Sequence, residues 1–228
     1  MNMRTTMSEG FWDFSNRVYR KRNVSLCCLC CLCCLSLQDL YGLDVNLLLF
    51  ACWHARSRGL FEPALVEKAL TFSSTWADHV VKPLRGARRW MKTQMESCKA
   101  PHEEVLSEKV LDEDFHRLRE QIKALELQSE KFQEHTLESM VSGRELLLSV
   151  EMQIAAAVYN LHCVLLSTFN SEQLPRPLPL HDFLTTLILN ALDQDPDDDN
   201  LQQAVSRELN AQRLGRPGVR ICESLPSA

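Results

Sequence analysis

Six of the ten cysteines crowd into the run from Cys27 to Leu35, in which the triplet Cys-Cys-Leu occurs three times. On a helix, Cys27, Cys30 and Cys33 share one face, and thiolates placed in this way could bind Cu(I) or Zn²⁺. Zinc sites, however, usually draw their ligands from separated pairs, and no second pair follows nearby. The run therefore predicts a core helix of small hydrophobic residues, with no metal and no cofactor.

Asp44 and Asn46 form a second candidate site, because they are polar residues at the start of a very apolar segment. Buried polar groups need partners, and a small or lipid-like ligand could supply them in a pocket with Trp12 and Trp53. The alternative is structural: Asp44 caps the following helix, and Asn46 bonds to neighbouring backbone. Capping is the favoured interpretation, and the pocket is kept as a hypothesis.

A third candidate is the basic stripe, which consists of Lys82, Arg85, Arg88, Arg89 and Lys92. Most of these residues recur at steps of three and four, so they fall on one helix face, with Trp90 among them. This face could bind a protein partner, phosphate groups or an anionic membrane surface. The alternative is pairing inside the chain with acidic residues of the next helix, at Glu103, Glu104, Asp112 and Glu113.

The composition of the whole chain favours helices over sheets. The 228 residues are 45% hydrophobic and include only seven glycines and three tyrosines. A formal net charge of −5 argues against nucleic acid as a partner, because proteins that bind it usually present a strongly basic face. Clustered cysteines cannot connect distant parts of a chain, so we interpret them as reduced thiols of a cytoplasmic protein.

A basic and then apolar stretch near the N-terminus resembles a secretory signal. Basic residues between Arg17 and Arg22 precede the apolar stretch from Val24 to Leu37. No small-residue cleavage site follows, and the stretch is shorter than the ~20 residues that cross a bilayer. We therefore predict a buried helix at this place.

Hydrophobic spacing and helix-breaking residues predict the other elements. The helix from Val45 to Arg58 is apolar on nearly every face and should be buried centrally. Pro83 should break or kink the chain after a helix that begins at Pro63. A long helix from about Ser107 to Met140 should pack against a helix from Glu145 to Leu166 as an antiparallel hairpin. The long helix has a one-sided apolar stripe: Val110, Phe115, Leu118, Ile122, Leu125, Phe132 and Leu137.

These elements predict an all-α fold, a single bundle of about six or seven helices with a loosely attached C-terminal extension. The bundle should span residues 8–170. The extension, residues 171–228, should begin with the proline-rich linker Leu174 to Pro179 and contain short helices and an acidic, partly disordered tail.

Three strings of residues resemble a family of uncharacterised proteobacterial proteins, a domain of unknown function. The resemblance extends from about Phe11 to Leu166, and it implies an all-helical protein without an assigned activity. The strings are Phe11-Trp12-x-Phe14-Ser15-x-x-Val18-Tyr19, Leu37-Gln38-x-x-Tyr41-Gly42-x-Asp44-Val45-Asn46-Leu47-Leu48-Leu49-Phe50-x-x-Trp53, and Val80-Val81-x-Pro83-Leu84-Arg85-x-x-Arg88-Arg89.

The chain departs from that family pattern within the cysteine run. Joining Leu29 directly to Ser36 restores the spacing of the family, so Cys30 to Leu35 resembles an insertion of two Cys-Cys-Leu units. Six extra helical residues would turn whatever follows by roughly 120°. We therefore expect a bulged or shifted second helix, and a higher melting temperature (Tm) when the six residues are deleted.

No motif in the sequence indicates catalysis. It contains no glycine-rich phosphate loop, metalloprotease motif or nucleophile elbow, so we assign no catalytic residue and lean against an enzyme. The favoured function is a protein-interaction module that uses the basic stripe or the long helix. The pocket for a small or lipid-like ligand is the alternative, and peripheral membrane association is a weaker one.

Overall fold

The structure is a computed structural model of the chain that describes residues 9–20, 29–97, 106–169 and 178–212. All regular elements in these ranges are helical, which confirms the predicted all-α class. They are α1 (Phe11–Arg20), α2 (Leu29–Tyr41), α3 (Val45–Ser57), α4 (Pro63–Trp76), the π-helical turn η1 (Ala77–Val81), α5 (Lys82–Ser97), α6 (Leu106–Ser139), α7 (Val150–Thr168), α8 (Leu178–Ala191) and α9 (Asp199–Ala211).

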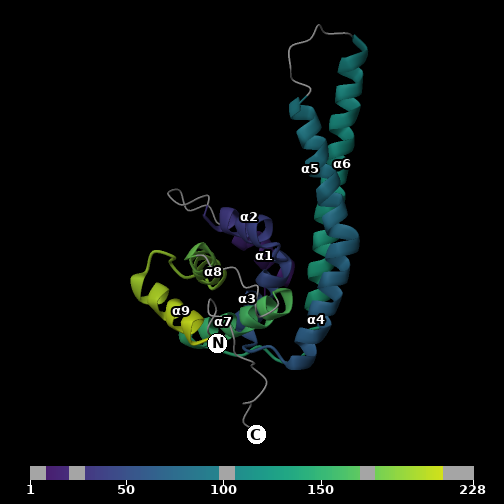
Figure 1. Cartoon of the computed structure of the whole chain (residues 1–228). Helices are drawn as coiled ribbons and strands as arrows, with labels where there is room; N and C mark the ends of the chain where they lie inside the picture. Colours follow the sequence, from purple (N-terminus) through teal and green to yellow (C-terminus); the bar gives the residue numbers. More distant parts are fainter. Residues whose placement is uncertain (1–8, 21–28, 98–105, 170–177, 213–228) are drawn as a thin grey trace, which may run out of the picture.

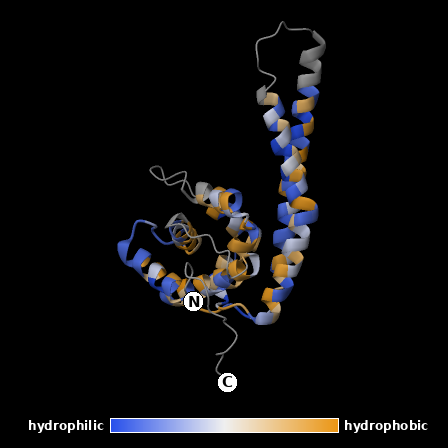
Figure 2. Ribbon diagram, viewed as in Figure 1, coloured by the Kyte–Doolittle hydropathy of each residue, from blue (hydrophilic) through white to orange (hydrophobic). Residues whose placement is uncertain are grey.

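The helices form a body and an arm. The body contains α1, α2, α3, α7, α8 and α9, whereas α4, η1 and α5 run side by side with α6 in an arm that projects away from the body (Figure 1). Hydrophobic and hydrophilic residues alternate along the arm in Figure 2. The arm is therefore amphipathic along its length, and only its base is packed against the body.

Helix α3 is the centre of the body, as its sequence predicts. Every residue from Val45 to Ala55 is buried, including the polar residues Asn46 and His54. Asp44 caps the helix by accepting hydrogen bonds from the backbone N–H groups of Asn46 and Leu47, at 3.0 and 3.3 Å. This confirms the predicted cap. On α1, Phe11, Phe14 and Val18 form the predicted buried face.

Asn160 of α7 closes the other end of α3, and no sequence pattern predicts this role. Its side-chain amide is fully buried and donates to the carbonyls of Ala51 and Gly59, at 3.2 and 3.0 Å. Its oxygen accepts a hydrogen bond of 2.7 Å from the backbone N–H of Phe61. Gly59 has φ +80°, which a glycine adopts without strain, so the chain can turn here directly after the helix.

Helix α7 lies in the core beside α3. Among the described residues, it is the helix whose length and mean hydropathy of 1.2 would also suit a membrane span, and half of that window is buried inside the protein. It does not form the predicted hairpin with α6, since α6 packs against α5 and α7 packs against α3. The segment between them is attached at the end of α3, where the backbone N–H of Leu146 donates to the carbonyl of Ser57 at 2.6 Å.

The two C-terminal helices are part of the same core. The sequence predicts a loosely attached extension after residue 170, but Leu184, Leu187 and Ile188 of α8 are buried among the residues of α2, α3 and α7. Asp193, which follows α8, also forms ion pairs with Arg17 of α1 and Arg56 of α3, at 2.5 and 2.9 Å. The apolar face of α8 explains the difference, because an exposed helix would leave it in water.

Helix α6 buries a polar face, which corrects the predicted stripe. Leu137 is buried as expected, but Leu118, Leu125 and Phe132 are about half exposed. The residues that α6 does bury are mainly polar: Glu126, Ser129, Gln133 and Glu134. The apolar stripe therefore does not mark the face of α6 that packs against other helices. The polar side chains of the packed face are satisfied by hydrogen bonds and ion pairs instead.

Pro83 does not break the helix that begins at Pro63. The chain continues from α4 into α5 through the π-helical turn η1, whose five residues directly precede Lys82. A proline has no N–H and its ring clashes with the carbonyl four residues earlier. The wider turn accommodates Pro83 at the base of the arm, so the predicted break is a local change of helix type.

Helix α2 is regular through the suspected insertion. It runs without interruption from Leu29 to Tyr41 and ends before Gly42, which has φ +66°. The predicted bulge is therefore absent from this described part, whereas residues 21–28 lie outside it. Cys33 and Cys34 are buried in the body, as the core-helix interpretation predicts.

Deleting Cys30–Leu35 should raise the Tm. The shortened chain again places Leu-Cys-Cys-Leu before Ser36, so Cys27 and Cys28 replace Cys33 and Cys34 in the core. The connection to α1 becomes shorter, and the lower entropic cost of closing it should raise the Tm by about 1–2 °C. Differential scanning calorimetry measures the change. A Cys34→Asp control should lower the Tm, and a lower Tm for the deletion would contradict the insertion hypothesis.

Replacing Asn160 by leucine should destabilise the body. Asn160→Leu leaves the carbonyl of Gly59 and the N–H of Phe61 buried without this partner, so the free energy of unfolding should fall by about 3 kcal/mol. Urea denaturation followed by circular dichroism measures the loss. Asn210→Leu, at an exposed position of α9, should cost less than about 0.5 kcal/mol, and equal losses would argue against the role of Asn160.

Candidate functional site: a polar cavity between arm and body

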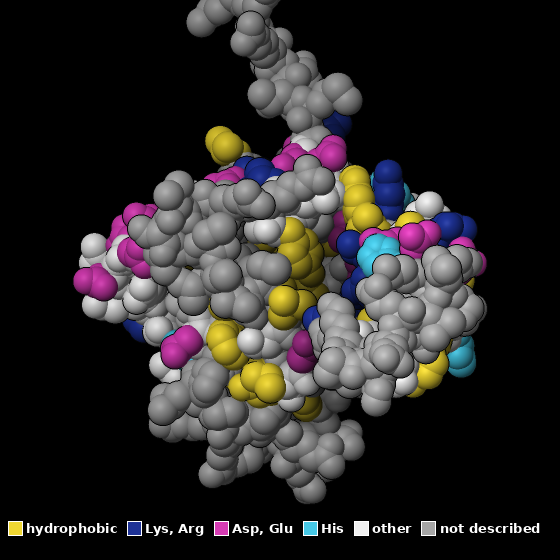
Figure 3. Space-filling model, turned by 90° about the horizontal axis from the view of Figure 1, so that it is seen from above, with side chains coloured by type: hydrophobic (Ala, Val, Ile, Leu, Met, Phe, Trp, Pro, Cys, Tyr) yellow, Lys and Arg dark blue, Asp and Glu magenta, His cyan; other side chains and the backbone are white. Residues whose placement is uncertain are grey.

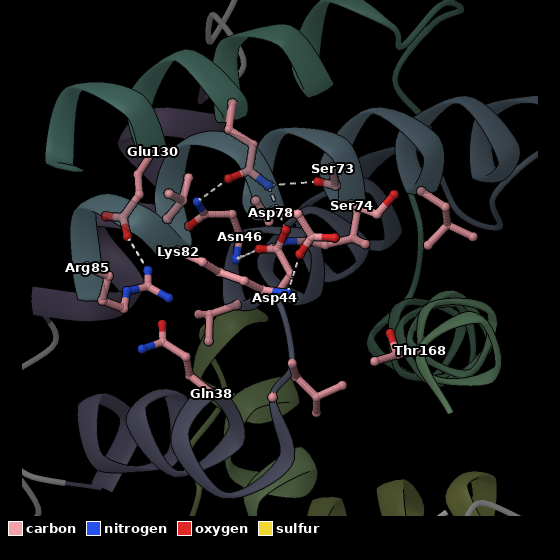
Figure 4. A pocket seen from close by; sticks show the side chains of 18 of the residues that line it. Gln38, Asp44, Asn46, Ser73, Ser74, Asp78, Lys82, Arg85, Glu130 and Thr168 are labelled. Atoms are coloured by element: carbon pink, nitrogen blue, oxygen red, sulfur yellow. Dashed lines mark hydrogen bonds and ion pairs between the residues drawn. The ribbon is translucent and has the colours of Figure 1, made fainter. Parts of the chain in front are cut away.

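Two of the candidate sites predicted from the sequence meet in one cavity. A cavity of about 600 Å³ lies where the arm joins the body, and its lining includes Asp44 and Asn46 together with Lys82, Arg85 and Arg89 of the basic stripe. Figure 4 shows Lys82 and Asp44 extending toward the same hollow, with Arg85 and Glu130 on one side and Gln38 across from them. The site therefore combines residues of α2, α3, α5 and α6.

Gln133 of α6 organises the wall of the cavity that belongs to α3. Its amide nitrogen donates to Oδ2 of Asp44 and to Oγ of Ser73, at 2.7 Å each. Its oxygen accepts a hydrogen bond of 2.9 Å from Nδ2 of Asn46. One side chain of the arm therefore connects the start of α3 with α4, and it orients Asp44 and Asn46 at the edge of the cavity.

The arginines of the basic stripe form ion pairs inside the chain. Arg85 binds Glu126 and Glu130, at 2.9 and 2.6 Å, and Arg88 also binds Glu126. Arg89 pairs with Asp39 of α2. Pairing inside the chain is the alternative that the sequence left open, but the acidic partners differ from Glu113. The other acidic residues of that alternative, Glu103, Glu104 and the side chain of Asp112, lie outside the described part.

Lys82 differs from the arginines in its exposure. It pairs with Asp78 one turn earlier, at 2.5 Å, and both side chains are exposed. An exposed pair of this kind contributes little stability, so either partner can exchange for another charged group at low cost. The same holds for the exposed pair of Arg89 and Asp39, whereas Arg85 is held by two carboxylates.

The remaining predicted residues lie elsewhere. Arg88 borders a separate groove of about 400 Å³ between α5 and α6, and Lys92 lies one turn beyond Arg88 on α5, away from the cavity lining. Trp53 is buried in the core and donates a hydrogen bond of 3.1 Å from Nε1 to the carbonyl of Glu9. Trp12 packs under the ammonium group of Lys131. The predicted pocket thus keeps Asp44 and Asn46 but neither tryptophan.

Several lining residues escaped sequence reasoning, and Gln133, Ser73, Glu130 and Gln38 are the main examples. One feature of the sequence could have indicated two of them. Gln133 and Glu130 are polar residues on a helix whose apolar stripe is too narrow to cover the whole face that packs against other helices. The π-helical turn η1 also contributes Ala77, Asp78 and Val81 to the lining. Such turns occur frequently at functional sites.

Burial and neighbouring charges shift the pKa values of the carboxylates in and beside the cavity. Burial raises the pKa of Asp44 and of Glu130, although Arg85 opposes the shift of Glu130. Burial also raises the pKa of Glu134 to about 8, and the nearby carboxylates of Glu130 and Asp44 add to the shift. At Glu126, hydrogen bonds from Arg88 and Arg85 outweigh burial, so its pKa is lowered.

The described residues of the cavity lining do not form a metal centre. Among those residues, no three His, Cys, Asp or Glu side chains are arranged to hold a metal ion. The arrangement can bind a ligand, because the lining combines ammonium and guanidinium groups of α5, the carboxylate of Asp44 and the apolar side chains of Leu47 and Leu70.

The fold and this cavity define an all-helical protein with a projecting arm and a polar binding site at the base of the arm. The chain belongs to the family described as "Protein of unknown function (DUF2390)", whose members it matches over residues 10–137, more than half of its length. The matched region is shorter than the resemblance in the sequence suggested, and it ends within α6. No curated protein and no solved structure matches the chain.

Glu134→Gln should remove a pH-dependent loss of stability. A folded-state pKa of about 8 lies above the ordinary value, so the folded protein holds this proton more tightly than the unfolded chain. Stability should therefore fall as pH rises from about 4.5 to 8, by up to about 1.4 kcal/mol per pH unit. Glutamine mimics the protonated acid, so the variant should lose less stability between pH 5.5 and 8 than the wild type.

Chemical denaturation at several pH values tests this prediction. Glu113→Gln, at an exposed position of the same helix, is the matched control and should retain the pH dependence of the wild type. If Glu134→Gln had the same pH profile as the wild type, the raised pKa of Glu134 would not govern stability in this range.

Proposed function

We propose that this protein is a non-enzymatic binding protein, and that its cavity takes a small ligand with one anionic and one cationic group. A single observation supports the proposal most directly. Residues from two distant stretches of the sequence, Asp44 with Asn46 and Lys82 with Arg89, line one cavity that contains both signs of charge. A cavity of about 600 Å³ also falls in the usual size range of ligand pockets.

The anionic group of the ligand would bind to Lys82 and Arg89. Both side chains are exposed and pair with exposed acids, Asp78 and Asp39, so a ligand carboxylate can take the place of these partners. Arg85 is a less available partner, since Glu126 and Glu130 hold it on two sides. In this proposal, Arg85 positions Glu130 at the rim of the cavity.

The cationic group would bind to Asp44. This carboxylate accepts hydrogen bonds from Gln133 and from backbone N–H groups, but no lysine or arginine of the described part forms an ion pair with it. A partly buried carboxylate without a basic partner is costly, and a ligand ammonium group would compensate it. The proposal replaces the tryptophan-lined pocket and uses the basic stripe as part of a cavity instead of as a protein-binding face. It keeps the cytoplasm as the expected compartment.

Matched small molecules test this function. We expect α-amino acids or dipeptides to bind in isothermal titration calorimetry and to raise the Tm, because they carry both charges. The corresponding amines and carboxylic acids, which lack one charge each, should bind at least tenfold more weakly. If none of the three sets bound, or if singly charged analogues bound equally well, the proposal would be wrong.

Variants connect binding to the cavity. Lys82→Gln should weaken binding of the best α-amino acid at least tenfold, because the anionic group loses a partner. Lys92→Gln lies on the same helix outside the cavity lining and should bind like the wild type. Asp44→Asn retains a good helix cap but removes the charge, so it should also bind more weakly. Equal effects of Lys82→Gln and Lys92→Gln would place the ligand elsewhere.

A further inference from the structure

The arm carries apolar residues along one of its sides, which we name the apolar flank: the exposed residues Trp90, Leu118, Leu125 and Phe132, together with the partly buried Trp76. Four of these are about half exposed, with 59% for Trp90, 50% for Leu118, 51% for Leu125 and 52% for Phe132. Figure 3, which views the molecule from above, shows hydrophobic side chains exposed among charged ones on the part of the surface that is not grey. Single exposed leucines are ordinary, but a continuous row is not.

The residues of the flank lie in one row. Leu118, Leu125 and Phe132 follow each other at intervals of seven residues, which places them on one face of α6. Two contacts connect this face to α4 and α5: the rings of Trp76 and Phe132 lie 4.7 Å apart, and those of Trp90 and Phe115 lie 6.4 Å apart. The row therefore follows the seam between the two sides of the arm from its base toward its tip.

The flank points away from the body. Glu130 borders the cavity at the body, and Glu134 is buried near α1. Phe132 lies two residues from each of them, and two residues correspond to about 200° around a helix. The base of the arm thus has a polar side that joins the body and an apolar side that the body leaves open.

The chemistry of the flank suits a protein interface. The exposed residues of α6 between its apolar positions include Gln121 and Gln128, which are uncharged. A large aromatic side chain buries roughly 200 Å², so four half-exposed side chains offer on the order of 400 Å². A standard interface buries about 800 Å² on each partner, slightly more than half of it apolar. The flank therefore supplies about the apolar area that one side of a stable dimer needs.

We infer that the apolar flank binds the same flank of a second copy of this chain, so that two arms form a four-helix bundle. A two-fold axis makes one patch sufficient for both partners. Because the flank points away from the body, two arms can meet along their length while the bodies remain on opposite outer sides. Packing of helix pairs with apolar rows every seven residues is the arrangement of four-helix bundles. This inference does not depend on the ligand proposed for the cavity.

The chain offers a closely matched pair of variants. Leu125 and Leu127 are the same residue type on the same helix, with similar exposures of 51% and 55%. They point in nearly opposite directions, since they are two positions apart along the helix, and only Leu125 lies on the flank. Both leucines are exposed, so neither Leu125→Glu nor Leu127→Glu should impair folding, and circular dichroism of each variant tests this.

Sedimentation velocity on the full chain tests the inference, with a reducing agent present because the chain has ten cysteines. We expect the wild type and Leu127→Glu to be dimers at 50 μM. Leu125→Glu should raise the dimer dissociation constant at least tenfold, because the two-fold axis places the charge in the interface twice. A monomeric wild type would overturn the inference and leave the flank to another partner. Equal dissociation of both variants would also overturn it.

Discussion

The complete burial of α3 is the constraint on which the rest of the structure depends. A helix that is buried on every side must be surrounded by other helices, and its two ends must find hydrogen-bond partners away from water. Side chains from distant parts of the chain meet that requirement: Gln133 of α6 at the start of α3, through Asp44 and Asn46, and Asn160 of α7 at its end. These two residues connect the arm and α7 to the two ends of α3.

The attachment of the arm explains its unusual surface. Gln133 faces the body, and the pairs of Arg85 and Arg88 with Glu126 connect α6 to α5 within the arm, so the packed side of α6 is polar. The apolar residues of the same helix are displaced to the outer side. A buried pair is costly unless both charges are satisfied, and Glu126 satisfies two arginines. The cavity and the exposed flank are thus two consequences of one arrangement, a helix packed through its polar side.

The elements were largely predictable from the sequence, because local signals determine them. The apolar run after Asp44, the glycines at 42 and 59 and the proline at 63 correctly indicate α3 and the start of α4. The packed face of α6 was not predictable in the same way. Its apolar spacing indicates Leu118 and Leu125 as core, whereas the partners of Glu126 and Gln133 are distant in the sequence and leave no periodic signal. Asn160 is likewise one polar residue in an apolar helix.

The candidate site shows the same limit. Asp44 and Asn46 were identifiable because they interrupt an apolar run, and Lys82, Arg85 and Arg89 because they share a helix face. That both groups line one cavity depends on how the arm meets the body, which a linear pattern does not contain.

The region that matches the family lacks a helix that packs against α3. Residues 10–137 include α3, the arm and most of the cavity, but they end before α7. In this chain Asn160 satisfies three backbone groups around the end of α3, and Leu161 and Leu165 cover its side. The matched region alone would therefore expose part of the buried helix α3 to water and leave the buried N–H of Phe61 without its partner. Helix α7 is consequently part of the folding unit, although the family match does not include it.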